Sequence, residues 1–157
     1  RAAPVPQRIV FVGSGPLAYA ARESALKVME LTAGQVPALW DSTLGFRHGP
    51  KSFVRGDTAI VVLTSPGHPA AAYDADLAAE LRRQFPQARI TTLGPQGDLP
   101  FAMPDGAAWG APLSILYAQC LAVVWSAALG LNVDDPFAGQ GTLSRVVSGV
   151  KLYPVMA

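Results

Sequence analysis

The stretch ARESALKVME (21–30) carries three charged side chains whose spacing could gather them at one site. Glu23, Lys27 and Glu30 stand at positions i, i+4 and i+7, so at about 3.6 residues per turn all three project from one side of a helix. That side faces either a substrate or water. In water a Glu–Lys pair of this spacing stabilises the helix by only about 0.2–0.5 kcal/mol. The spacing alone favours water.

A second group of candidate residues lies in the loop TLGFRHGPKS (43–52). Glycines surround Arg47 and His48 in a stretch that has neither a helical nor a strand period. A loop histidine titrates near neutral pH, so His48 could serve as an acid or base beside the charged helix, although a surface histidine in a turn is the simpler interpretation. This loop follows shortly after the helix. The two features together favour the interpretation that the charged face of the helix faces a substrate rather than water. His68, in the turn SPGHP, is interpreted as a surface residue.

The loop GSGPLA (13–18) matches a loose form of the dinucleotide-binding pattern G-x-G-x-x-G/A, and Asp41 could then hold a ribose hydroxyl. The match is weak, because small residues are common wherever a parallel strand turns into a helix. Backbone N–H groups at such a helix start can receive an anion, and a phosphate fits as well as a pyrophosphate. Ser14 and Gly15 are therefore candidate substrate-binding residues.

Alternating strand and helix patterns must position these residues. Helices are predicted from Pro16 to about Gly34 and over 70–84, and short apolar runs predict strands at 8–15, 36–40, 58–64 and 88–93. The alternation predicts an α/β fold, a three-layer Rossmann-like sandwich with a mostly parallel sheet flanked by helices. Ligands bind such sheets at the carboxyl ends of the strands, which here are followed by the loops 13–16, 41–50 and 64–69.

A long uncharged segment follows, since no charged residue occurs between Asp105 and Asp134. Residues 111–131 are long enough to span a bilayer, but serines and Gln119 interrupt them and much of the apolarity comes from alanine. We instead predict a helix over 111–129 that is buried on nearly all sides, in the core or at a subunit interface. We therefore expect a dimer or a close pairing of domains, and a buried, inert thiol for Cys120.

Length and composition restrict the classes of protein. The 157 residues suit one domain with one core, and a net charge of +1 with 15% charged residues gives no basic surface for nucleic acid or an anionic membrane. A single cysteine and no signal-peptide pattern predict a cytoplasmic protein. The two histidines and the cysteine lie too far apart in sequence for a metal site. Residues 1–7 are typical of a linker, so we expect 1–157 to be one domain of a longer polypeptide, with an irregular tail at 130–157.

These motifs together resemble the second sugar isomerase (SIS) domain of two-domain phosphosugar isomerases. ESALKVMELTAG followed by FRHGPKS is similar to the isomerase half of glucosamine-6-phosphate synthase. With DSTLGFRHGPKS and the tail LSRVVSGVKLYP, the chain most closely resembles the tagatose-6-phosphate ketose/aldose isomerase family, which includes galactosamine-6-phosphate deaminases. The resemblance covers nearly the whole chain.

The resemblance implies aldose–ketose chemistry on a sugar 6-phosphate through an enediol-type intermediate, without a cofactor. It implies that Glu30 moves a proton between C1 and C2, that Lys27 stabilises charge on the sugar oxygen and that Glu23 holds Lys27 in place. His48 would open the sugar ring, commonly in a neighbouring subunit's site. An aminosugar substrate such as galactosamine-6-phosphate would yield tagatose-6-phosphate and ammonia. The candidate substrate-binding residues are Ser14, Gly15, Arg47, Ser65 and Arg145.

Two departures from the family pattern modify these expectations. The Ser/Thr-rich loop that grips the phosphate is here TSPGHP, so we expect the phosphate clamp in a preceding SIS domain. Where the synthase has a tail lysine able to form a Schiff base, this chain has Arg145, which cannot act as an amine nucleophile at its pKa. Lys151 could substitute, but a surface lysine is the simpler interpretation. Direct isomerisation is therefore favoured.

Two other functions fit parts of the sequence. SIS-type domains also serve as phosphosugar-sensing halves of transcription regulators, although a sensor needs neither the base nor the ring-opening histidine, and nothing here resembles a helix-turn-helix. A dinucleotide-binding domain would depend on GSGPLA and Asp41 alone. The isomerase or deaminase ranks first, the sensor second and the dinucleotide-binding domain well behind.

Overall fold

A computed structural model describes residues 4–141, 143–144 and 149–154 of the chain. The elements within these ranges are, in order, β1 Arg8–Gly13, α1 Pro16–Leu31, β2 Ala38–Ser42, the short 3₁₀ helices η1 Gly45–Arg47 and η2 Pro50–Phe53, β3 Thr58–Leu63, α2 Ala70–Gln84, β4 Arg89–Leu93 and α3 Ala107–Ala128. The predicted helices and strands are confirmed, with boundaries that differ by a few residues.

The four strands form one parallel sheet in the order β2-β1-β3-β4. The chain moves from β1 outward to β2, then returns to β3 beside β1 and continues outward to β4. The strand order therefore reverses between β1 and β3, and their carboxyl ends form the topological switch point. The predicted α/β class is confirmed.

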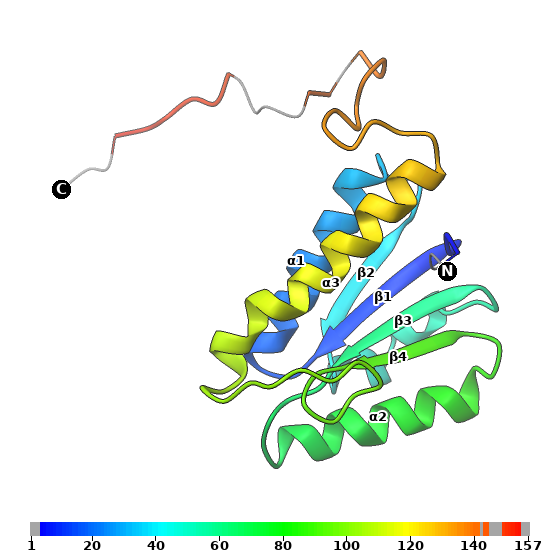
Figure 1. The fold of residues 1–157 in the computed structure, drawn as a ribbon, viewed down its shortest axis with the longest axis vertical. Coiled ribbons are helices and arrows are strands. Elements are labelled where there is room, and N and C mark those ends of the chain that lie inside the picture. Colours follow the sequence, from blue (N-terminus) through cyan, green and yellow to red (C-terminus); the bar gives the residue numbers. More distant parts are fainter. Residues whose placement is uncertain (1–3, 142, 145–148, 155–157) are drawn as a thin grey trace.

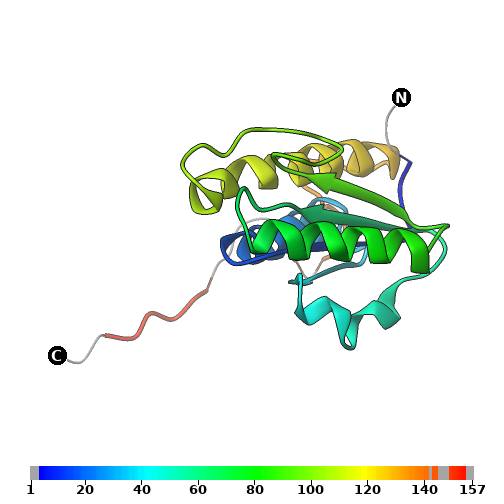
Figure 2. The ribbon, with the colours of Figure 1, turned by 90° about the horizontal axis from the view of Figure 1, so that it is seen from below.

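Successive side chains of a strand point to opposite faces, so the sheet carries two separate cores. Ile9 and Phe11 of β1 pack with α1 and α3, whereas Val10 and Val12 pack with α2 and with Phe46 of η1. Figure 1 shows α1 and α3 side by side on one face of the sheet, and Figure 2, seen from below, shows α2 and the η1–η2 segment on the near side. The three layers predicted from the sequence are confirmed.

Helix α1 begins where the sequence predicts it, with Pro16 in its first turn. A side chain at Gly13 would clash with the backbone of the first helical turn, since its Cβ would lie 2.8 Å from the carbonyl oxygen of Leu17. Gly15 has a φ of 53°, in the left-handed region that favours glycine. The backbone conformation and packing thus explain why glycine stands at both positions of GSGPLA, without a ligand.

Of the two places predicted for α3, the core is wrong, because the described chain does not bury the helix on nearly all sides; a subunit interface stays a prediction. Helix α3 packs with one stripe, on which Ser114, Ala118, Ala122 and Trp125 are buried. On its other side bulky apolar side chains are exposed, among them Trp109, Leu113 and Leu116. The apolar composition of the helix does not show which of its sides the rest of the chain covers. Cys120 is exposed on this helix, so the predicted buried thiol is also wrong.

By length and composition, α3 is the one helix among the described residues that could cross a membrane. Its most apolar window has a mean hydropathy of 1.5, and 22% of that window is buried. A single apolar helix of this kind, packed on α1 in the same domain, does not indicate a membrane protein. After α3 the described residues form an irregular chain that leads away from the sheet (Figure 1).

Candidate functional site

The three charged residues of α1 form one connected group. Nζ of Lys27 lies 3.3 Å from Oε1 of Glu23 and 2.6 Å from Oε2 of Glu30. The helix buries Ala25 and Val28 against the sheet, which fixes its rotation and leaves the charged residues at the side of the buried stripe. The Lys27 side chain is 25% exposed and both carboxylates are 42% exposed, so the group is half-buried rather than fully solvated.

The hydrogen bond to Glu30 dominates the electrostatics of Lys27. It raises the pKa of the Lys27 ammonium above its ordinary 10.5, against a smaller lowering effect of burial, and Glu23 adds further raising contributions. Lys27 is therefore fully protonated at neutral pH. The arrangement offers a carboxylate able to accept a proton, next to a cation that can stabilise a developing oxyanion.

A groove of about 620 Å³ lies between α1 and the edge strand β2, and Glu23 lines it. Tyr19 and Met29 contribute from the helix and Trp40 from the strand. The Arg22 guanidinium lies 5.7 Å from the centre of the Trp40 ring, within range of a cation–π contact. Sequence reasoning missed this groove, because the spacing of a strand does not reveal that an edge tryptophan stays 40% exposed beside the helix.

The loop with His48 lies on the opposite face of the sheet. Phe46, two residues earlier, is fully buried in the core beneath α2, and Arg47 forms ion pairs with Asp76 and Glu80 of α2. His48 itself is exposed, and its backbone N–H donates to the carbonyl of Gly45 at 3.1 Å. Within one chain the structure therefore does not bring His48 to the charged face of α1.

The carboxyl edge of the sheet is organised by Asp74 of α2, which is fully buried. Its Oδ1 accepts hydrogen bonds from Ser14 Oγ and Thr43 Oγ1, both at 2.6 Å, and its Oδ2 accepts one from the backbone N–H of Ser65 at 2.9 Å. One carboxylate thus ties together the loops that follow β1, β2 and β3. Sequence reasoning missed Asp74, although Asp74, Leu77 and Leu81 share the i, i+3, i+7 spacing of the buried stripe of α2.

This arrangement bears on the candidate residues Ser14, Gly15 and Ser65. A buried carboxylate at the switch point repels a phosphate placed beside it, and the hydroxyl of Ser14 is already donated to Asp74. Gly15 is exposed, and Ser65 Oγ is buried with no hydrogen-bond partner among the described residues. The edge is therefore less suited to an anion than the glycine pattern suggested.

The remaining candidate, Arg145, lies outside the described residues. Lys151 is described, and its exposed ammonium lies 5.0 Å from the centre of the Tyr153 ring. Within the part of the chain that the structure describes, no three His, Cys, Asp or Glu side chains cluster in a way that could hold a metal ion.

Known proteins resemble this chain over almost its full length. D-galactosamine-6-phosphate deaminase AgaS from Escherichia coli is 44% identical over 161 aligned positions, which cover 96% of this chain and 42% of that protein. The crystal structure of tagatose-6-phosphate ketose/aldose isomerase from Escherichia coli has a TM-score of 0.78 and 38% identity, covering 99% of this chain and 41% of that one. The chain belongs to the AgaS-type sugar isomerase (SIS) domains. The resemblance predicted from the helix and loop motifs is confirmed.

The wider SIS fold is shared by more distant proteins. The C-terminal domain of glucosamine-fructose-6-phosphate aminotransferase from Francisella tularensis has a TM-score of 0.67 at 19% identity, and the match covers 82% of this chain and 37% of that one. No family model matches the chain. The chain spans about two fifths of the length of the AgaS relatives it matches.

Proposed function

We propose that the protein containing this SIS domain is a phosphosugar aldose–ketose isomerase that deaminates galactosamine-6-phosphate to tagatose-6-phosphate and ammonia. The observation that carries the proposal is the position of Lys27, whose ammonium group lies between the carboxylates of Glu23 and Glu30 on one half-buried face of α1. The 44% identity to AgaS supports the substrate.

The chemistry assigns one step to each side chain. Glu30 removes the proton from C2 of the open-chain sugar, and the electrons pass to the C1 aldehyde oxygen, where Lys27 stabilises the negative charge. Glu30 then returns the proton to C1, and one proton passes from the C2 nitrogen to the C1 oxygen anion. The products are a C1 hydroxyl and a neutral imine at C2, which one water molecule hydrolyses to the ketose and ammonia. Glu23 retains Lys27 when its ammonium group turns from Glu30 to the substrate oxygen.

His48 would open the sugar ring as acid and base. It lies on the face of the sheet opposite to Glu30, so we propose that it acts in the site of a neighbouring copy of the chain. Glu30 is 42% exposed in this chain, and coverage by a neighbouring copy or domain would withdraw it from water, as a general base at neutral pH requires. Both arguments support a homo-oligomer.

We further propose that this chain is the second of two SIS domains, with 1–7 as a linker and 130–157 as an irregular tail. The relatives are more than twice as long as the matched segment, which leaves room for another domain. Asp74 fills the switch point where a phosphate would bind, so the phosphate clamp is assigned to that other domain. A cytoplasmic location fits a sugar-phosphate substrate.

The test uses phosphorus NMR of galactosamine-6-phosphate with the complete natural polypeptide, and an ammonia assay in parallel. The proposal predicts a ketose phosphate and an equal amount of ammonia, both lost in Glu30→Gln and retained in Asp57→Asn, which changes a half-exposed carboxylate paired with Arg89. Binding without turnover of this or any other sugar 6-phosphate would overturn the proposal in favour of a phosphosugar sensor.

A further inference from the structure

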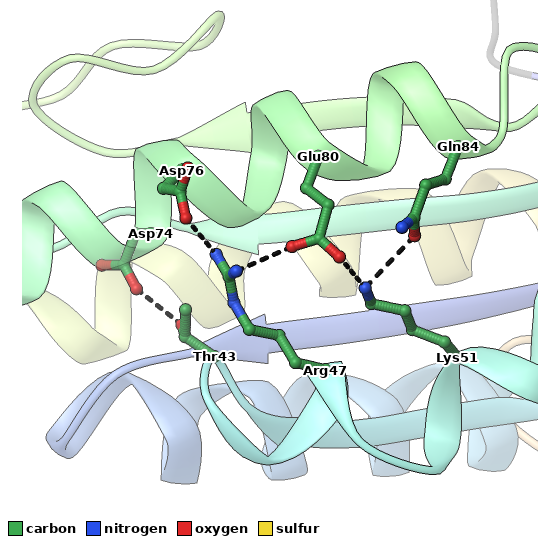
Figure 3. A network of polar contacts seen from close by, with 7 residues as sticks. All are labelled: Thr43, Arg47, Lys51, Asp74, Asp76, Glu80 and Gln84. Atoms are coloured by element: carbon green, nitrogen blue, oxygen red, sulfur yellow. Dashed lines mark hydrogen bonds and ion pairs between the residues drawn. The ribbon is translucent and has the colours of Figure 1, made fainter.

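The loop that carries His48 is tied to α2 by a polar network (Figure 3). The acceptors Asp76, Glu80 and Gln84 are spaced four residues apart, so they form one stripe along α2. Arg47 donates to Asp76 Oδ2 and to Glu80 Oε2, each at 2.7 Å. Lys51 pairs with Glu80 Oε1 and also contacts Gln84 at 3.2 Å.

Glu80 is the acceptor that both cations share. One of its oxygens binds Arg47 and the other binds Lys51, so a single carboxylate joins two points of the loop. The side chains of Glu80 and Lys51 are only 18% and 15% exposed, so this pair is better shielded from solvent than an ordinary surface ion pair. The hydrogen bond from Lys51 lowers the pKa of Glu80 below its ordinary range, so the carboxylate is charged at neutral pH.

His48 lies between the two attached cations, one residue after Arg47 and three residues before Lys51. Its own side chain is exposed, while Phe46 beside it is fully buried. The backbone around His48 is thus fastened on both sides and the imidazole projects outward. A loop held in this way loses little backbone freedom when its histidine meets a substrate.

We infer that Glu80 is a positioning residue for His48, which it holds in place by binding Arg47 and Lys51 together. The inference depends on the role of His48 in the proposed function. A merely structural network would stabilise the domain without acting through His48. The two possibilities differ in how Glu80 and His48 substitutions combine.

The experiment is a double-mutant cycle in the complete protein with Glu80→Gln, His48→Asn and the double variant. Glu80→Gln keeps the size of the side chain and removes its charge. We expect kcat to fall about 10- to 100-fold with KM nearly unchanged, because misplacement of a group that acts in the reaction affects turnover. In the His48→Asn background the same change should have no further effect. A loss of equal size in both backgrounds would overturn the inference.

Asp76→Asn is the matched control, because it removes one ion pair of Arg47 and leaves the shared acceptor in place. It should reduce kcat much less than Glu80→Gln. Amide hydrogen exchange supplies a readout that does not depend on activity: Glu80→Gln should accelerate exchange in the segment 45–51 and leave α1 unchanged. Unchanged exchange in 45–51 would overturn the positioning role. If His48→Asn does not affect turnover but exchange in 45–51 accelerates, the proposed role of His48 fails while Glu80 remains the anchor of the loop.

Discussion

The ammonium nitrogen of Lys27 lies 2.6 Å from Oε2 of Glu30, one turn further along α1. The proposed base and the cation that would stabilise the substrate oxyanion are thus in direct contact on one helix. The same cation lies within 3.3 Å of Glu23, so it can leave Glu30 for a substrate oxygen without losing all of its pairing. This geometry distinguishes the group from a single i,i+4 pair on a solvated helix.

Substitution of Lys27 by methionine tests its role directly. Lys27→Met retains most of the length of the side chain and removes its charge, so kcat/KM should fall about 10²- to 10³-fold through loss of oxyanion stabilisation. The free energy of unfolding should change by only about 0.5 kcal/mol, because partly exposed helix pairs contribute little. Steady-state kinetics and urea unfolding measure the two effects. The same change at the exposed Arg83 serves as control, and equal kinetics for both variants would rule out a catalytic role for Lys27.

The raised pKa of Lys27 predicts a pH dependence of stability. A lysine whose pKa is higher in the folded state contributes stability below its unfolded value of 10.5, and this contribution is lost as the pH rises through the folded pKa. Glu30→Gln removes the main cause of the shift, so it should reduce stability at neutral pH, and the difference from the unmutated protein should vanish in alkali. Thermal melts across this pH range test the prediction. A difference that persists above the folded pKa would show that Glu30 acts through another contact.

Asp74→Asn should destabilise the carboxyl edge of the sheet. An amide has only one acceptor oxygen, so at least one of the donors from Ser14, Thr43 and Ser65 loses its acceptor. A buried donor without an acceptor costs about 1–3 kcal/mol, which urea unfolding can detect. Asp105→Asn at an exposed loop position is the control. Equal stability of the two variants would mean that Asp74 does not hold the three loops.

The exposed apolar side of α3 predicts an interface. Leu116 is 53% exposed, so Leu116→Lys should leave the domain folded but place a charge in a contact between chains or domains. Sedimentation of the complete protein should show a smaller assembly or a less compact one. Tyr73→Lys, on α2, controls for the added charge, since Tyr73 is 49% exposed on the other face of the sheet. An identical sedimentation profile for both variants and the unmutated protein would place the interface elsewhere.

The sequence predicted the elements well where a local period controls them. The charged face of α1 follows from the spacing of Glu23, Lys27 and Glu30 alone, and the helix motif together with the loop motif around His48 identified the family. The separation of His48 from Glu30 could not be predicted, because it depends on which face of the sheet the loop after β2 joins. Phe46 decides this by packing beneath α2, and no local pattern specifies that contact.

Burial was harder to predict than secondary structure. An uncharged helix suggested that Cys120 and its neighbours are covered, whereas α3 packs with one stripe, which includes Ala118 and Trp125, and leaves other bulky apolar side chains such as Leu116 exposed. Asp74 shows the opposite case, since this carboxylate on the apolar stripe of α2 is fully buried. The three hydrogen bonds that it accepts offset the cost of its burial. In both cases long-range contacts override the local composition.

The most direct measurement is complementation between two inactive variants of the complete protein. Glu30→Gln and His48→Asn are expressed together, and the mixed oligomers are assayed for galactosamine-6-phosphate turnover. If His48 acts in the site of a neighbouring chain, a mixed dimer contains one intact site, and an equal mixture should recover about one quarter of the unmutated activity. Glu30→Gln mixed with Lys27→Met should recover none, because these residues share one site. No recovery in the first mixture would contradict a site shared between chains.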